Sequence, residues 1–296
     1  MGIATAILFL ALPMAAQMVE DNRVVTKRFP VTAGAAPEIA VAIVTGGIRV
    51  TASSGNEIVM NAKVHYEAPD AASLAELQKR VRLETEQSGN NVWIGTESDE
   101  WDRGNGSRRP RELGWRNRTP PSSGSSGEGG RRSSFRHDIE LQVPRTAHLK
   151  LRTVNGGSIE IDGVSGEFDL NNVNGGIEVK RADGFGRANT VNGPVSIDFA
   201  RHPSGATSVK TINGKVHLYF PTGLNADFQI KTYNGKIYSD FALAGRASTP
   251  EAIESSNGMK RIWRSNAFSN TRAGRGGLQI QIDGFNGDIH ILEKKN

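Results

Sequence analysis

The sequence predicts an all-β protein, a β-solenoid of roughly 20-residue coils with one capping helix in the N-terminal region. The main observation is an Asn-Gly pair that recurs along the chain, flanked each time by the same pattern of apolar residues. The composition agrees with this prediction. With 34 glycines and an aromatic content of only 6%, the 296-residue chain suits short strands and tight turns better than a helical bundle.

Residues 1–17 are predicted to be a secretory signal peptide. Their apolar run is too short to span a bilayer as a helix, and Ala15 and Ala16 offer a cleavage site. An uncleaved N-terminal anchor is the alternative interpretation. Both place the rest of the chain outside the cytoplasm, so we expect an exported protein that is periplasmic, at the cell surface or extracellular. The absence of cysteine excludes disulfides, thiolate zinc sites and cysteine nucleophiles.

Six full copies of the repeat carry the Asn-Gly pair, and a degenerate copy at residues 39–51 has Thr45-Gly46 in its place. A long insertion separates the fifth full copy from the last. We expect these pairs to be structural turns whose glycines supply the positive φ that a tight turn needs. The turn residues are Asn155, Gly156, Asn174, Gly175, Asn192, Gly193, Asn213, Gly214, Asn234, Gly235, Asn286 and Gly287.

Apolar residues stand at fixed distances from each turn glycine, with polar residues between them. This alternation and the many β-branched side chains are typical of half-buried strands on both sides of the turn. Five residues before the glycine stand Val41, Leu151, Leu170, Ala188, Val209, Ile230 and Ile282. Two before it stand Val44, Val154, Val173, Val191, Ile212, Tyr233 and Phe285. Two after it stand Ile48, Ile177, Val195, Val216, Ile237 and Ile289.

Two folds fit a strand, an Asn-Gly turn and a second strand. Independent hairpins would form an antiparallel meander. Near-identical copies can instead each form one coil of a solenoid, with like positions stacked about 4.8 Å apart. The matched columns favour the solenoid. Stacked asparagines would then bond through their side-chain amides, which explains why asparagine recurs at the turn rather than aspartate.

An N-terminal β region is expected at residues 18–97, and it includes a helix at about residues 71–86. Asp70 can cap the start of this helix. Its apolar residues lie on one rough helical face, and they are Leu74, Leu77, Val81 and Leu83. We predict that the helix packs across an open end or edge of the solenoid.

Two insertions interrupt the strand patterns. Residues 98–136 are rich in Arg, Gly and Ser and nearly free of aliphatic side chains, so they are predicted to be disordered. Residues 137–296 hold the solenoid repeats. A second, polar insertion at about residues 245–277 is predicted to loop out between the fifth and the last full copies.

The order of these motifs resembles that of the bacterial DUF4097 family of candidate adhesins, which have β-strand repeats. The resemblance rests on VTGGIRV, on an ELQVP strand, and on LKLRTVNGGSIEIDGVSGEFDLNNVNGGIEV with its further VNG copies. It covers about residues 36–292 without the two insertions. The resemblance implies a right-handed β-solenoid that is exported or associated with the envelope. It implies no catalytic residues, and the Arg/Gly/Ser insertion departs from the family pattern.

The residues indicate no catalytic centre, no cofactor and no metal site. None of the six histidines stands at a metal-ligand spacing, and His217 and His290 share an outward position in their copies. Enzymatic β-helices gather carboxylates on stacked coils, but no column here is reliably acidic. The carboxylates concerned are Glu160, Asp162, Glu178, Asp198 and Asp240. We therefore expect a protein that is not an enzyme.

The arginine-rich insertion is the one candidate for an anionic-ligand contact. Its residues for this role are Arg108, Arg109, Arg111, Arg131 and Arg132, interleaved with aromatic side chains. A merely solubilising loop is the alternative. For an exported protein, envelope polysaccharide, anionic lipid or an envelope protein are the partners considered, and no nucleic acid is expected.

Taken as a sequence, the chain is best interpreted as an exported non-catalytic β-solenoid. It would act as an adhesin-like or structural binding module at the bacterial cell envelope. The first alternative is a protein-binding module for envelope-stress sensing or regulation. A carbohydrate-active enzyme is the remaining one.

Overall fold

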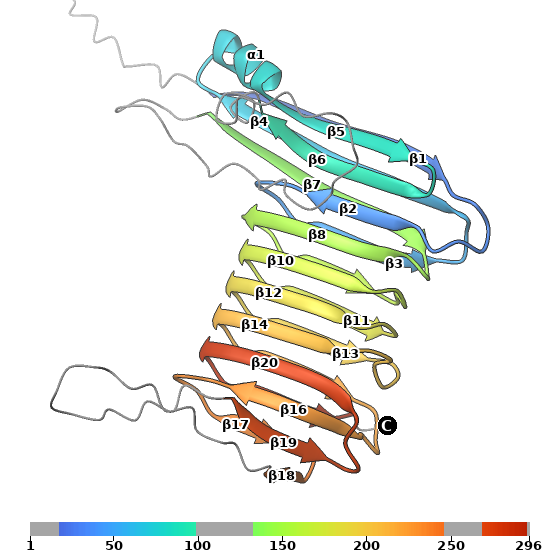
Figure 1. Cartoon of the computed structure of the whole chain (residues 1–296). Helices are drawn as coiled ribbons and strands as arrows, with labels where there is room; N and C mark the ends of the chain where they lie inside the picture. Colours follow the sequence, from blue (N-terminus) through green and yellow to red (C-terminus); the bar gives the residue numbers. More distant parts are fainter. Residues whose placement is uncertain (1–17, 99–132, 246–267, 295–296) are drawn as a thin grey trace, which may run out of the picture.

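The computed structural model describes residues 18–98, 133–245 and 268–294 (Figure 1). The predicted signal peptide lies outside these residues. The described strands form two large sheets, a ten-stranded sheet that we name sheet A and an eleven-stranded sheet that we name sheet B. The prediction of an all-β fold with one helix is confirmed. Within the described part of the chain, no helix is both long and apolar enough to cross a membrane.

Each repeat contributes one strand to each sheet. The strand before the Asn-Gly turn joins sheet B and the strand after it joins sheet A. In sheet B these strands are β8 (His148–Asn155), β10 (Phe168–Asn174), β12 (Gly186–Asn192) and β14 (Thr207–Asn213). In sheet A they are β9 (Ile159–Asp162), β11 (Ile177–Ala182), β13 (Val195–Phe199) and β15 (Val216–Phe220).

Neighbouring copies pair in parallel and in register. Leu170 lies beside Leu151 on one side and beside Ala188 on the other, so the apolar columns of the sequence become rows that cross the strands. The two strands of one copy lie in different sheets and are not a hairpin. The antiparallel meander is therefore wrong for the repeats.

The degenerate first copy pairs in register with the first full copy. Its strands are β2 (Glu38–Ala42) and β3 (Ile48–Ser53), which pair in parallel with β8 and β9. Thr45 forms a bridge with Asn155, so the Thr-Gly turn stacks on the first Asn-Gly turn. The register of the repeat thus continues across more than 100 intervening positions of sequence, from residue 46 to residue 156.

The last copy does not lie at the end of the stack. Its strands β20 (Leu278–Asn286) and β21 (Ile289–Glu293) insert between β14 and β15 on one side and β16 (Ala226–Lys231) and β17 (Ile237–Ser239) on the other. Figure 1 shows β20, in red, between the orange strands β14 and β16. The order of the coils in space therefore differs from their order in the sequence.

Part of the polar insertion expected at residues 245–277 is sheet. Its described part includes β19 (Ser269–Ala273), which pairs antiparallel with β16 and with β18 (Leu243–Gly245). Only Ala273 of β19 is fully buried, so the segment carries almost no apolar pattern. Pairing with the free edge of β16, and an ion pair of Arg272 with Asp227 at 2.6 Å, hold this strand in place.

The N-terminal region extends both sheets at the other end of the stack. Sheet A gains the antiparallel strands β1 (Val19–Pro30), β4 (Glu57–Ala68) and β7 (Ser134–Pro144). Sheet B gains β5 (Val81–Ser88) and β6 (Asn91–Ser98). The predicted disordered segment, residues 98–136, is corrected at its end, because β7 begins at Ser134 and pairs with β4.

The helix α1 (Ala71–Arg80) is shorter than the expected span of residues 71–86. Asp70 caps its start as predicted, because its carboxylate accepts a hydrogen bond from the backbone N–H of Ser73 at 2.8 Å. Residues 81–86 belong to β5, because pairing with β6 satisfies their backbone groups and buries Val81. The helix contacts β1, β4 and β5 at the N-terminal end of the stack (Figure 1).

Candidate binding surface

The six turn asparagines stack one above another in a ladder of side-chain hydrogen bonds. Five side-chain amides donate, each to the side-chain oxygen of the asparagine in the preceding coil of the stack, over distances from 2.7 to 3.0 Å. The ladder runs in the order Asn155, Asn174, Asn192, Asn213, Asn286 and Asn234. An aspartate would lack the donor at each step, so the ladder explains the choice of asparagine.

The turn glycines are required for two different reasons. Gly156 and Gly287 have φ of 76° and 142°, as expected for a tight turn. Gly175, Gly193, Gly214 and Gly235 do not have positive φ. A Cβ on any of these four would collide with a glycine carbonyl of the neighbouring coil. The prediction of positive φ is therefore wrong for these glycines, which are needed because the turns stack closely.

A second polar column lies inside the stack beside the turns. The hydroxyls of Thr153, Thr190 and Thr211 donate to the carbonyls of Gly46, Gly175 and Gly193, at 2.8, 2.8 and 3.0 Å. These threonines are at most 3% exposed. They satisfy carbonyl groups that the close stacking would otherwise leave buried and unbonded. The recurring threonine of the T-x-N-G motif is thus structural, as are the turn asparagines and glycines.

In the six full copies the apolar column two residues before the turn glycine faces outward, whereas Val44 of the degenerate copy is buried, at 2% exposed. It stands three positions after the buried column, and because side chains alternate along a strand, an odd separation places them on opposite faces. Ile212, Phe285 and Tyr233 are 39%, 47% and 69% exposed. Val154, Val173 and Val191 in the same column are half-buried. In the full copies, the column that lies in the core before the turn is therefore the one five residues before the glycine.

A row of rings crosses the outer face of sheet A in the same three coils. His290 stacks between His217 and Tyr238, with ring centroids 4.7 and 4.8 Å apart. This places both histidines on an outward column, where the sequence predicts them. Burial lowers the pKa of His217, and the neighbouring His290 and Lys215 lower it further. Both effects favour the neutral imidazole of His217.

Exposed apolar side chains are concentrated at this end of the stack. Among the described residues, the large apolar side chains that are exposed are Val24, Ile212, Tyr233, Ile237, Tyr238 and Phe285. All of these except Val24 belong to the last three coils of the stack. We name one surface, the aromatic edge, for the residues that flank the turns of these coils. It consists of Ile212, Phe285 and Tyr233 beside sheet B and of His217, His290 and Tyr238 beside sheet A.

Lysines surround the aromatic edge. Lys215 and Lys236 directly follow turn glycines and are exposed. Lys210 and Lys231 stand two residues before Ile212 and Tyr233, on the same outer face of sheet B. Two aspartates of the middle coil balance part of this charge. Asp283 lies 3.6 Å from the Lys210 ammonium, and Asp288 accepts the backbone N–H of Lys236 at 2.9 Å.

The carboxylates considered in the sequence are each engaged in ordinary contacts. Glu160 bonds Arg49 and Ser158, and the hydroxyl of Ser158 is the main cause of the lowered pKa of this carboxylate. Asp162, Glu178 and Asp198 form ion pairs of 2.8, 3.1 and 2.6 Å with Arg181, Lys180 and Lys294. Asp240 accepts the backbone N–H of Glu293. This arrangement does not present a pair of carboxylates poised for acid–base chemistry.

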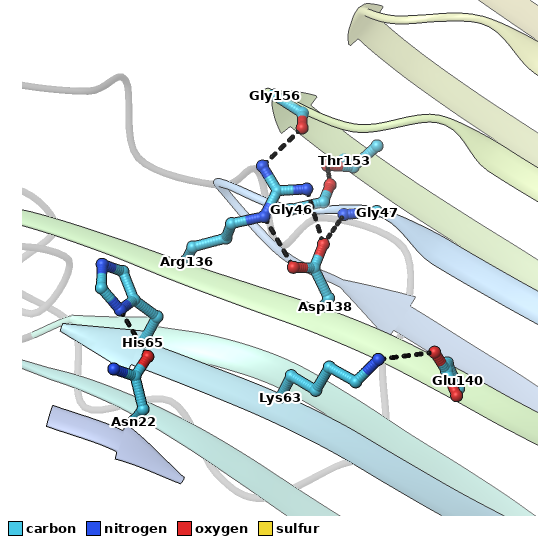
Figure 2. Close-up of polar contacts among 10 residues, drawn as sticks. All are labelled: Asn22, Gly46, Gly47, Lys63, His65, Arg136, Asp138, Glu140, Thr153 and Gly156. Carbon is cyan, nitrogen blue, oxygen red and sulfur yellow. Dashed lines mark hydrogen bonds and ion pairs between the residues drawn. The ribbon is translucent and has the colours of Figure 1, made fainter. Parts of the chain in front are cut away.

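The arginines proposed as anionic contacts lie outside the described residues, namely Arg108, Arg109, Arg111, Arg131 and Arg132. Arg136, just after them, has a structural role (Figure 2). Its guanidinium bonds the Asp138 carboxylate at 2.6 Å and the carbonyl of Gly156 at 2.6 Å. Asp138 in turn accepts the N–H of Gly47 at 2.8 Å. The cluster fixes β7 to the first two turns of the stack.

Two further polar contacts drawn in Figure 2 join neighbouring strands of sheet A. Lys63 of β4 lies 3.3 Å from Glu140 of β7, and His65 of β4 lies 2.7 Å from Asn22 of β1. All four side chains are solvent-accessible. Exposed pairs of this kind contribute at most about 1 kcal/mol each, so we interpret them as solvated strand contacts.

His137 is a buried titratable residue that the sequence analysis missed. Its Nδ1 lies 2.9 Å from the Thr96 hydroxyl and its Nε2 lies 3.4 Å from the Tyr66 hydroxyl. The imidazole is 0% exposed, and burial lowers its pKa to about 4. Its position two residues before Ile139, on the same face of β7, is the sequence signal that indicates burial.

Comparisons with known proteins leave the family of this chain open. No protein-family model matches it, and no curated protein matches it. One similar solved structure is a candidate cell adhesion protein from Clostridium sporogenes, with 13% identity, a TM-score of 0.42, and coverage of 94% of this chain and 100% of that one. A candidate lipid-binding protein from Parabacteroides distasonis has 8% identity, a TM-score of 0.28, and coverage of 92% and 97%. A candidate adhesin from Bacteroides fragilis has 9% identity, a TM-score of 0.23, and coverage of 92% and 97%.

Proposed function

We propose that this protein is an exported, non-catalytic binding module of the bacterial cell envelope, adhesin-like or structural, and that the aromatic edge is its binding surface. One observation carries the proposal. Five of the six large apolar side chains that are exposed in the described residues belong to three neighbouring coils. Exposed apolar side chains scattered over a surface need no explanation, whereas a group of them in one place is typical of an interaction site.

The arrangement of the repeats supports a right-handed β-solenoid as the scaffold. Each copy places one strand in each sheet, and like positions of neighbouring copies lie side by side. Such a stack is stabilised by contacts between neighbouring coils, and it presents its outward columns as long, regular rows. A row of this kind suits an extended partner better than a small substrate.

Export and membership of the DUF4097 family are part of the same proposal. The apolar segment at residues 1–17 supports export, and the VNG repeats support membership of the family. The absence of catalytic function is supported by the engaged carboxylates and by the structural roles of the turn residues. Under this proposal the protein binds an envelope component without chemical turnover.

The proposal is tested by binding the purified full chain to washed cell envelopes and to purified peptidoglycan. We expect the double variant Tyr233→Ala and Phe285→Ala to bind at least about 10-fold more weakly, because truncating a contact aromatic commonly costs more than 1 kcal/mol. Val24→Ala is the matched control, since Val24 is 69% exposed but lies in the N-terminal region. Equal binding by the wild type and the double variant would show that the aromatic edge is not the site.

A protein-binding module for envelope sensing is the second candidate, and the free edge of sheet A favours it. The terminal strand β17 pairs only with β21 among the described residues. Ile237 and Tyr238 on this strand are 42% and 44% exposed. An extended segment of a partner can add to such an edge through backbone hydrogen bonds.

Substitution of Ile237 by proline separates this candidate from the first one. The change removes a backbone donor of β17, while the aromatic side chains of Tyr233 and Phe285 remain. Loss of a purified envelope partner in a pull-down, with binding to peptidoglycan intact, would favour the sensing module. Retention of that partner by the variant would argue against pairing at the β17 edge.

A further inference from the structure

We propose that the aromatic edge binds the anionic headgroup surface of a phospholipid bilayer. This inference rests on the proposed binding function and names the class of its ligand. The site has the shape of a straight row of side chains. Ile212 lies on β14 and Phe285 on β20, which are hydrogen-bonded neighbours in sheet B, and Tyr233 lies two residues after the end of β16, the next strand of that sheet. Their side chains therefore form a straight row with a spacing of about 4.8 Å, which can lie along a flat surface.

The aromatic rings of Tyr233 and Phe285 are stacked on each other, which limits how a partner can contact them. Tyr233 and Phe285 stack face to face, with centroids 5.0 Å apart and an interplanar angle of 3°. Sugars pack against the faces of aromatic rings, and here each ring covers one face of the other. The rims of the rings, including the Tyr233 hydroxyl, are left to contact a partner. Rings with an apolar body and a polar tip suit the boundary between headgroups and acyl chains.

The lysines beside the row give this edge a positive charge. Lys215 and Lys236 are exposed next to the row, and Lys210 and Lys231 lie along its sheet B side. Asp283 and Asp288 oppose them, so the four lysines exceed the aspartates of this edge by two charges. The Lys231 ammonium also lies 5.8 Å from the centre of the Phe268 ring. Apolar side chains fringed by lysines bind anionic lipid, because lysine stems cover apolar surface while their ammonium groups reach the headgroups.

The test uses the full chain and two kinds of vesicle, one of phosphatidylcholine alone and one that also contains phosphatidylglycerol. We expect co-sedimentation only with the phosphatidylglycerol vesicles, and a decrease in binding as salt is added. Each lysine near an anionic surface contributes about fivefold to binding. The variant Lys215→Glu with Lys236→Glu should therefore lose at least about 25-fold. Tyr233→Ala with Phe285→Ala should also weaken binding, without reducing its dependence on salt.

The matched control is Lys27→Glu with Lys79→Glu, which makes the same change in net charge with two exposed lysines of the N-terminal region. This control should bind as the wild type does. Lys215→Gln with Lys236→Gln guards against a folding defect, because it removes the charges without reversing them and should show a smaller loss in the same direction.

Three outcomes would overturn the inference. They are equal binding to both kinds of vesicle, an equal loss in the Lys27/Lys79 control, and binding to peptidoglycan without binding to vesicles. The last outcome leaves the proposed binding function intact and assigns the edge to a polymer. Absence of binding to vesicles, peptidoglycan and whole envelopes would contradict the proposed function as well.

Discussion

At the scale of single residues, buried His137 links the stability of the N-terminal region to pH. Its neutral ring accepts a hydrogen bond from Thr96 and donates toward Tyr66, whose hydroxyl donates to the carbonyl of Val81 at 2.9 Å. A charged imidazole at this position would lose its hydration. Its Nδ1 would also carry a proton and could no longer accept the hydrogen bond from Thr96. Burial therefore lowers its pKa from 6.5 to about 4.

The sign of the pH effect follows from this lowered pKa. Between pH 6.5 and about pH 4 the unfolded chain binds a proton at His137 that the folded chain does not bind. Stability is therefore complete above pH 6.5 and falls as the pH decreases toward 4. We expect a loss of about 3 kcal/mol in the free energy of unfolding over this window.

Urea unfolding at pH 7 and pH 4.5 measures this effect. His137→Leu should remove most of the difference between the free energies of unfolding at the two pH values. The smaller difference that remains is expected from His217, whose pKa is also lowered. The carboxylates with lowered pKa, such as Asp183, lose their contribution only at lower pH. A variant that keeps the full pH dependence would show that His137 does not cause it.

The turn glycines give a second prediction at the residue scale. Gly193→Ala should destabilise the protein by about 1–3 kcal/mol, because the new methyl group overlaps the carbonyl of Gly175 in the next coil. Gly245→Ala is the control, since an added Cβ there meets nothing within 4 Å. Thermal unfolding followed by circular dichroism compares the two. Similar melting temperatures for both variants would contradict the close stacking of the turns.

At the scale of elements, the unexpected feature is the position of the last copy. The columns of the sequence define which residues stack, and Ile282 fits beside Val209 as well as it fits beside Ile230. The repeat pattern alone therefore cannot decide the order of the coils. The order is decided by the chain between β17 and β20, where β19 pairs antiparallel with β16 and covers its free edge.

Truncation after residue 277 tests this order. The change removes β20 and β21, so β16 and β17 lose the partners that join them to the rest of the stack. Hydrogen exchange should then show loss of protection at residues 226–239, while residues 168–199 stay protected. If the last copy were simply the end of the stack, residues 226–239 would keep their protection.

The sequence was sufficient for much of the fold at this scale. The Asn-Gly register identified which copies pair in parallel, including the degenerate copy at Thr45-Gly46, because strands paired in register require the same residue types at the same positions. The predicted C-terminal boundary of the helix was wrong, because pairing of β5 with β6 overrides the helical pattern beyond Arg80. The prediction that the second insertion loops out was wrong for its described part. There β19 is held by backbone pairing and one ion pair, and neither leaves an apolar pattern in the sequence.

The candidate site was harder to predict, because Ile212, Phe285 and Tyr233 have apolar side chains of the kind that usually lie in the core. Only their odd separation from the buried column shows that they face outward. The lysines beside them are spread over three copies of the repeat and have no local motif. Stacking brings these lysines together on one edge, and the sequence alone directed attention to the arginines of the first insertion instead.

At the scale of the whole molecule, the two ends of the stack differ in character. The N-terminal end carries α1 and antiparallel strands, and its polar clusters, such as Arg136 with Asp138, connect neighbouring strands (Figures 1 and 2). The other end presents the aromatic edge. If the proposed binding surface is correct, the contact with a partner lies at one end of the stack and the N-terminal end stays outside it.

Hydrogen exchange of the full chain, with and without vesicles that contain phosphatidylglycerol or with washed envelopes, shows whether the aromatic edge is the surface that binds. Binding at the aromatic edge predicts slower exchange confined to residues 212–217, 233–238 and 284–290. Exchange in the strands β1 and β4 should not change. Slower exchange around β1 and β4 instead would contradict binding at the aromatic edge. Binding that leaves the exchange of the three named segments unchanged would contradict it as well.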